Sequence, residues 1–121
     1  SERIRFGMDA FSRGYDELGD LLWFGNHLKQ SGKINDLINL LKLLSERNPN
    51  YLIYLALAYK DAGNINQSKQ TANLLLYYED THPGTAIAKD NYNTLAELYR
   101  YFGDIKKRTR AFEKSGALQP F

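Results

Sequence analysis

Apolar side chains recur along this chain every three or four residues, which is the spacing of a helix that buries one face. The clearest run is residues 34–46, where a second apolar stripe lies beside the first. The first stripe consists of Ile34, Leu37, Ile38, Leu41 and Leu44. A helix with two stripes has neighbours on two sides, so we expect a layered array of helices. No stretch alternates apolar and polar residues over a strand's length, and valine is absent, so the pattern predicts an all-α fold.

Glycines and prolines divide the chain into segments of helical length. Seven helices are expected, over residues 2–13, 16–31, 34–47, 51–62, 66–80, 86–102 and 105–116. The connections between them are short, so consecutive helices should pack antiparallel. With 121 residues, the chain is long enough for one domain.

One pattern occurs three times, as WFGNHLKQSGKI at 23–34, YLALAYKDAGNI at 54–65 and TLAELYRYFGDI at 94–105. In each window a large apolar residue is followed by glycine or alanine, and then by Leu or Tyr and a cation one turn later. A glycine comes eight positions after the large residue, and an isoleucine comes two positions after that glycine. A proline closes each unit, at Pro49, Pro83 and Pro120.

Each position in this pattern has a physical reason. The small residue lets a partner helix approach closely, and the glycine takes the left-handed conformation that ends the first helix. The isoleucine starts a second helix on its buried side, and the proline cannot continue that helix. Each unit is therefore a helix–turn–helix of about 34 residues, which has to stack on the next unit to bury both of its faces.

The pattern resembles the tetratricopeptide repeat (TPR), and the resemblance covers residues 18–121. The second copy matches best, through Leu55, Ala56, Tyr59, Gly63, Ser68, Ala72 and Pro83. The resemblance implies a single domain of antiparallel helix pairs stacked as a right-handed superhelix. That domain would comprise an N-terminal helix over 1–14 and repeats over 18–50, 51–83 and 86–121. The family places a small residue five positions after the glycine, where this chain has Leu37, Ser68 and Arg108.

TPR-like arrays are binding modules, and their first helices line a concave face that receives a peptide or a helix of another protein. The inward-facing positions that the resemblance implies here are Leu22, Asn26 and Lys29, then Ile53, Leu57 and Lys60, then Asn93, Glu97 and Arg100. Part of the family grips a peptide carboxylate with Lys and Asn at such positions. This sequence offers Asn26 but apolar residues elsewhere, so that clamp is incomplete.

Two features of this face have a second interpretation. Stacked repeats would align Lys29, Lys60 and Arg100 as a ladder of cations, beside an apolar floor of Leu57 and Ile53. The alternative is that each cation faces the negative end of its own helix dipole. In the same way, Leu22 or Ile53 can be assigned to the core.

The sequence offers little that is typical of an enzyme. His27 and His82 lack metal-ligand spacing, cysteine is absent, and no nucleophile elbow, P-loop or dinucleotide motif occurs. We therefore expect no catalytic activity, no cofactor and no metal. The basic run KKRTR at 106–110 would suit an acidic partner or, more simply, a solvated helix face. The net charge is only +2, so nucleic acid is not an expected partner.

Two functions are consistent with these observations. The first is a protein–protein interaction module, a scaffold or adaptor that binds a partner's peptide or amphipathic helix. The second is an accessory TPR-like domain of a larger bacterial membrane, secretion, pilus-assembly or glycan-handling protein, which positions a substrate for an enzymatic part outside this chain. No apolar run reaches the length of a membrane span, so membrane contact would come only through such outside parts. The absence of cysteine favours the cytoplasm, with a periplasmic or membrane-tethered location as the alternative for a fragment.

Overall fold

The computed structural model describes residues 25–116, and every regular element in that range is helical. A short helical segment over residues 25–30 comes first. It is followed by α3 (Ile34–Arg47), the 3-10 turn η1 (Pro49–Tyr51), α4 (Leu52–Asp61), α5 (Ile65–Leu76), α6 (Tyr78–Thr81), α7 (Lys89–Phe102) and α8 (Ile105–Ser115). The prediction of an all-α fold is confirmed over these residues. The predicted helix over 2–13, most of the one over 16–31, and Leu22 lie outside the described residues.

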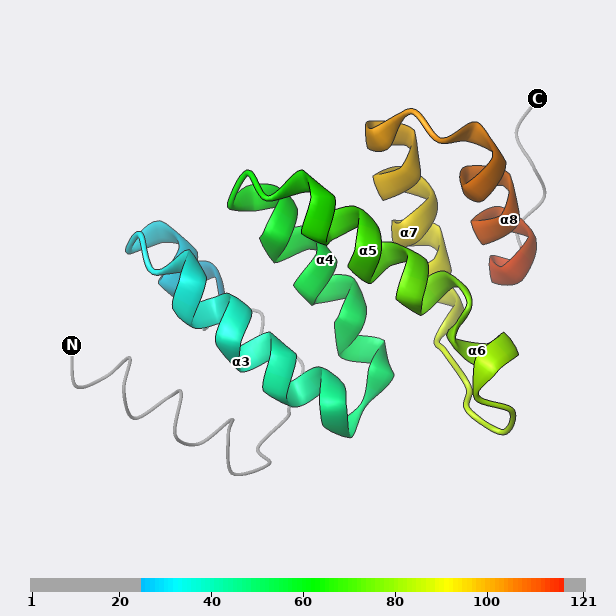
Figure 1. Cartoon of the computed structure of the whole chain (residues 1–121), viewed down its shortest axis with the longest axis horizontal. Helices are drawn as coiled ribbons and strands as arrows, with labels where there is room; N and C mark the ends of the chain where they lie inside the picture. Colours follow the sequence, from blue (N-terminus) through cyan, green and yellow to red (C-terminus); the bar gives the residue numbers. More distant parts are fainter. Residues whose placement is uncertain (1–24, 117–121) are drawn as a thin grey trace.

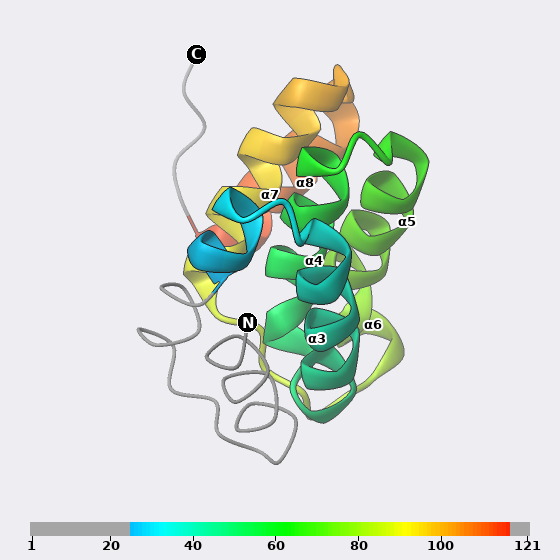
Figure 2. The same ribbon diagram turned by 90° about the vertical axis from the view of Figure 1, so that its left-hand side faces the viewer.

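The helices follow one another as hairpins across the molecule (Figure 1). Helix α4 packs against α5 and α7 packs against α8, while α3 contacts α4 and α5 contacts α7. In the turned view of Figure 2, the segment 25–30 and α7 lie toward one side of the molecule and α5 lies toward the opposite side. Helix α4 lies between them. The core runs through all these contacts, because Leu44, Ile53, Leu75 and Leu95 come from four different helices and are at most 1% exposed.

The three glycine turns predicted from the repeated pattern are confirmed, and they are equivalent. Gly32, Gly63 and Gly103 have φ angles of 73°, 80° and 79°, the left-handed region that favours glycine. In each turn, the residue after the glycine donates its N–H to the carbonyl five positions back. The distances are 2.8 Å for Lys33 to Leu28, 2.8 Å for Asn64 to Tyr59, and 2.9 Å for Asp104 to Tyr99. This bond satisfies a carbonyl that the helix end leaves free, so the sequence closes all three hairpins in the same way.

The small position of each pair is matched to the residue five places after the glycine. In the middle pair, Ala56 faces Ser68, whose hydroxyl donates to the Ala56 carbonyl at 2.7 Å. In the first pair Gly25 faces Leu37, and a Cβ placed on Gly25 would lie 3.4 Å from Leu37 Cδ1. That distance is an ordinary van der Waals contact, so Leu37 lies directly beside the small position of the first pair. In the third pair the position holds Arg108, whose buried Nε has no hydrogen-bond partner among the described residues.

A single helix over 66–80 is wrong, because Tyr77 leaves helical geometry and separates α5 from α6. Its φ and ψ angles are −103° and 9°. At this break the ammonium of Lys114, on α8, donates to the carbonyl of Leu76. That carbonyl is an acceptor that a continuing helix would have used for its own backbone.

Helix α7 begins at Lys89 and not at residue 86, because the residues before it are held in an extended conformation. Ala88 has a ψ of 136°. Its N–H donates to Asn50 Oδ1 at 2.9 Å, and the side-chain amide of Asn91 donates to the same oxygen at 2.8 Å. Asn50, in η1, thereby fixes the start of α7 and anchors the third helix pair on the second.

Candidate functional site

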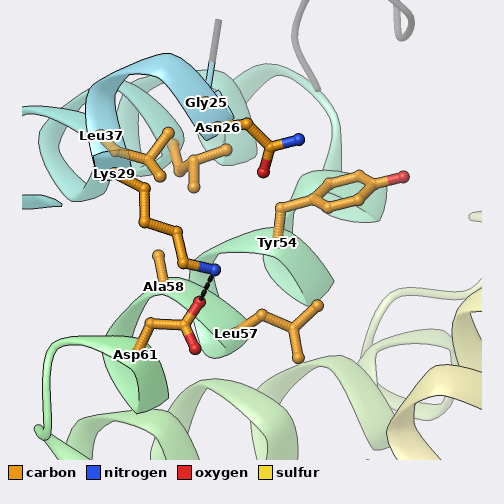
Figure 3. Close-up of a pocket in the computed structure, with 9 residues that line it drawn as sticks. Gly25, Asn26, Lys29, Leu37, Tyr54, Leu57, Ala58 and Asp61 are labelled. Carbon is orange, nitrogen blue, oxygen red and sulfur yellow. Dashed lines mark ion pairs between the residues drawn. The ribbon is translucent and has the colours of Figure 1, made fainter. Parts of the chain in front are cut away.

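An apolar pocket opens between the segment 25–30, α3 and α4 (Figure 3). Its volume is about 200 Å³. The lining consists of Gly25, Asn26, Lys29, Leu37, Leu41, Tyr54, Leu57, Ala58 and Asp61. Leu37, Leu41 and Ala58 are buried and form the floor, whereas Asn26, Lys29 and Asp61 are exposed at the rim. Apolar concave sites with a few polar groups at the edge are the usual form of binding pockets.

An ion pair closes one side of the pocket. Lys29 Nζ lies 2.7 Å from Asp61 Oδ2, and this contact joins the segment 25–30 to the last turn of α4 (Figure 3). The two side chains are 48% and 32% exposed, so water screens the pair and it adds little to stability. Its larger effect is geometric, because it holds the ammonium of Lys29 at the mouth of the hollow.

Tyr54 forms the opposite wall, with its ring half-buried. The ring lies 6.2 Å from that of Tyr51, at an interplanar angle of 48°. Burial raises the pKa of the Tyr54 phenol above its ordinary value. The wall therefore presents a partly buried aromatic side chain to the pocket.

Three of the residues expected on the concave face line this pocket together: Asn26, Lys29 and Leu57. Ile53, expected beside Leu57, is 1% exposed and belongs to the core. This agrees with the second interpretation of the sequence, which assigned Ile53 to the core. A side chain so deeply buried cannot touch a partner without unpacking the fold. Leu22 lies outside the described residues.

The other expected residues lie further along the array. Asn93, Glu97 and Arg100 are exposed and share one face of α7 at spacings of four and three residues. Lys60 is half-buried, and its ammonium lies 4.6 Å from the centre of the Tyr101 ring. None of these four residues lines the pocket.

The sequence interpretation missed six lining residues: Gly25, Leu37, Leu41, Tyr54, Ala58 and Asp61. Tyr54 and Asp61 directly follow two of the expected positions, Ile53 and Lys60, and a helix face wide enough to include both neighbours would have found them. Leu37 and Leu41 were assigned to the core, which they also serve, since a pocket floor is a core surface left uncovered.

The basic run on α8 is engaged in contacts within the chain. Asp80 Oδ2 accepts from Arg110 at 3.3 Å and from Lys114 at 3.2 Å, and hydrogen bonding by Lys114 is the main cause that lowers the pKa of this carboxyl. Lys107 lies 3.4 Å from Asp104, which also caps the start of α8. Two cations of the run, Lys107 and Arg110, are thus paired within the chain, while Lys106 is exposed, as the simpler interpretation of a solvated helix face expects.

The described part of the chain holds no group of three or more His, Cys, Asp or Glu side chains that could bind a metal ion. His82 stacks on Tyr78 with 4.0 Å between ring centres, and its Nδ1 lies 2.9 Å from the hydroxyl of Thr81, the last residue of α6. Between residues 25 and 116, no helix is both long and apolar enough to cross a bilayer.

Comparison with known proteins gives no match: no protein-family model, curated protein or solved structure is significantly similar to this chain.

Proposed function

We propose that this chain is a TPR-like helical-repeat module that binds a peptide or helix of a partner protein on the face formed by residues 25–30, α4 and α7. The observation that carries the proposal is that two cations at equivalent positions each contact the equivalent residue of the next window. Lys29 reaches forward to Asp61, and Lys60, at the equivalent position of the next window, reaches forward to Tyr101. Asp61 and Tyr101 are themselves equivalent, since each directly follows the cation of its own window.

A contact that recurs at equivalent positions supports repeats that are stacked with one common offset. The same offset from pair to pair generates a superhelix, and the first helices of the pairs then share one face. The three equivalent glycine turns support the same interpretation, because they give each hairpin the same geometry. The right-handed superhelix with an additional N-terminal helix remains part of the proposal.

The proposed binding face begins at the pocket and continues over Leu57 and Lys60 to the exposed side of α7, where Asn93, Glu97 and Arg100 lie. Its apolar part is the pocket, and its charged residues include the cations Lys29, Lys60 and Arg100. Such a face suits an amphipathic or acidic–apolar segment. Apolar contacts would supply most of the affinity, and the cations would supply orientation and sensitivity to salt.

The test starts with selection of binders to the full chain from a random-peptide display library. Affinities of the selected peptides are then measured for variants of the face. Leu57→Ala and Lys60→Glu should each weaken binding by about tenfold or more. Lys106→Glu, at an exposed lysine on α8, is the matched control and should leave the affinity within about twofold, because it lies outside the proposed face.

Two results would contradict this function. If no peptide is selected by the full chain, the proposed role as a peptide-binding module fails. If Lys106→Glu abolishes binding while Leu57→Ala and Lys60→Glu leave it intact, the interface is the basic helix α8 and not the face of the first helices.

A further inference from the structure

The pocket between residues 25–30, α3 and α4 has the size and lining to hold one aromatic ring. Its volume of about 200 Å³ exceeds the roughly 150 Å³ at which an apolar cavity binds benzene. The floor residues Leu37, Leu41 and Ala58 are 7%, 2% and 3% exposed, so they present fixed apolar surface. Because the hollow is open at its rim among the described residues, a side chain from another molecule can enter it without unfolding these helices.

Two wall residues favour a ring over an aliphatic side chain. Figure 3 places Lys29 and Tyr54 on opposite sides of the hollow, with Leu57 below them. A ring between them would meet the ring of Tyr54 on one side, in the offset or edge-to-face contacts that aromatic pairs prefer. On the other side it would meet the ammonium of Lys29, which Asp61 holds in place at 2.7 Å, and cations are attracted to ring faces.

The charges along the edge indicate what flanks that ring. Lys60 directly precedes the lining residue Asp61 on α4, and its ammonium lies 4.6 Å from the centre of the Tyr101 ring on α7. Asp61 is already paired with Lys29, so the cation on the α7 side of the pocket is Lys60. A carboxylate next to the ring in the bound segment would complement it.

We propose that this pocket receives a single aromatic side chain from a partner segment that carries an acidic residue on the side toward α7. The proposal rests on the proposed function, since it names the chemistry of the segment bound at that face. The ring is the anchor of the complex, and the acidic residue sets the direction in which the segment runs along the face.

The first experiment uses small probes on the full chain. Toluene, which represents the phenylalanine side chain, is titrated while methyl NMR signals of Leu37, Leu41 and Leu57 are followed, and methylcyclohexane is the aliphatic control. Toluene should bind saturably and shift these methyl signals, with at least about threefold higher affinity than methylcyclohexane because only the ring engages Tyr54 and Lys29.

Variants locate the probe. Ala58→Leu fills the hollow and should abolish toluene binding, while thermal unfolding shows that the fold is kept. Tyr54→Leu changes a half-buried wall position and should remove the preference for toluene over methylcyclohexane, so a test remains if Ala58→Leu fails to fold. Leu74→Ala, at a leucine of α5 that is 52% exposed and outside the pocket, should change neither result.

The second experiment examines the peptides selected on the proposed face. They should carry an aromatic residue with an Asp or Glu nearby, and replacing that aromatic residue by alanine should lower the affinity by about tenfold or more. Peptides that bind the face but carry no aromatic residue would overturn this inference and leave the proposed function standing. Equal binding of both probes, or no toluene binding, would also overturn it. Toluene binding without any selected peptide would support the ring pocket and overturn the proposed function.

Discussion

Ser68 donates its hydroxyl to the carbonyl oxygen of Ala56 at 2.7 Å, and neither residue is exposed to solvent. The bond joins α5 to α4 at Ala56, the residue that occupies the small position of the repeated pattern. In the first pair the equivalent residues are Gly25 and Leu37, and there an apolar side chain lies beside the small position. Two chemically different solutions therefore fill the same place in successive hairpins.

Exchanging one solution for the other should reveal their coupling. Ser68→Leu alone should destabilise the fold by about 1–3 kcal/mol, because the added carbons have no room beside Ala56. The double variant Ala56→Gly/Ser68→Leu reproduces the combination at positions 25 and 37, so its cost should be smaller than the sum of the two single changes. Urea unfolding measures the stability of Ala56→Gly, Ser68→Leu and the double variant. The coupling energy between the two positions should exceed about 0.5 kcal/mol. Strict additivity would mean that the two positions do not share one space.

Gly63 should be replaceable only by residues that tolerate a left-handed backbone. Its φ is 80°, yet a Cβ at this position would meet nothing within 4 Å, so the cost of substitution is backbone strain and not a clash. Gly63→Val should lower the free energy of unfolding by about 1 kcal/mol or more. Gly63→Asn should cost clearly less, since asparagine visits this conformation more readily. Thermal unfolding of the two variants compares them, and equal midpoints would contradict this explanation.

Lys114 should stabilise the break between α5 and α6. Its ammonium donates to the Leu76 carbonyl, and the side chain is only 17% exposed. Lys114→Met keeps most of the packing but leaves that carbonyl without its partner, so the free energy of unfolding should fall by about 1.5–3 kcal/mol. Arg110→Met is the control, because Arg110 contacts the same Asp80 from an exposed position and should leave the unfolding midpoint nearly unchanged. Similar effects of both changes would assign the role to Asp80 instead.

Tyr99 should make the fold sensitive to alkaline pH. Its hydroxyl donates to Asn73 Oδ1 at 2.8 Å, and burial is the main cause that raises the pKa of this phenol above its ordinary value. The folded state therefore favours the neutral phenol. The stability it contributes is complete below the unfolded pKa, near 10, and is lost as the pH rises above that value. The free energy of unfolding should then fall by up to about 1.4 kcal/mol per pH unit.

Replacing the phenol tests this assignment. Tyr99→Phe should flatten the decline in stability between about pH 10 and pH 11.5, although it lowers stability at neutral pH by removing the bond to Asn73. Tyr101→Phe, at a ring that is 59% exposed, should leave the slope as it is. An unchanged slope for Tyr99→Phe, followed by denaturant unfolding at each pH, would mean that this phenol does not govern the alkaline limit.

The glycine turns could be predicted from the sequence, because their cause is local. A residue with φ near 80° at the end of an apolar helix is nearly always glycine, and the spacing repeats in all three windows. The break at Tyr77 and the late start of α7 could not be predicted in this way. They depend on Lys114 and Asn50, each of which acts on a backbone group 38 residues away in the sequence. Local propensity contains no information about such partners.

The residues of the candidate site also separate into those that the sequence could predict and those that it could not. Asn26, Lys29 and Leu57 could be placed together, because the interpretation as stacked repeats puts aligned positions side by side, and all three line the pocket. The role of Asp61 could not, since its pairing with Lys29 is a contact between one hairpin and the next and leaves no mark within either window. Ile53 was ambiguous from sequence, because an apolar residue on a first helix can face either the core or the groove.

The fit of Gly25 against Leu37 has a consequence for how this chain can vary. A Cβ on Gly25 would lie 3.4 Å from Leu37 Cδ1, an ordinary van der Waals contact, and both residues line the pocket. A methyl group added at position 25 would therefore cost little in packing and would instead narrow the hollow. Variation at this position would change what the pocket admits before it changed how the hairpin folds.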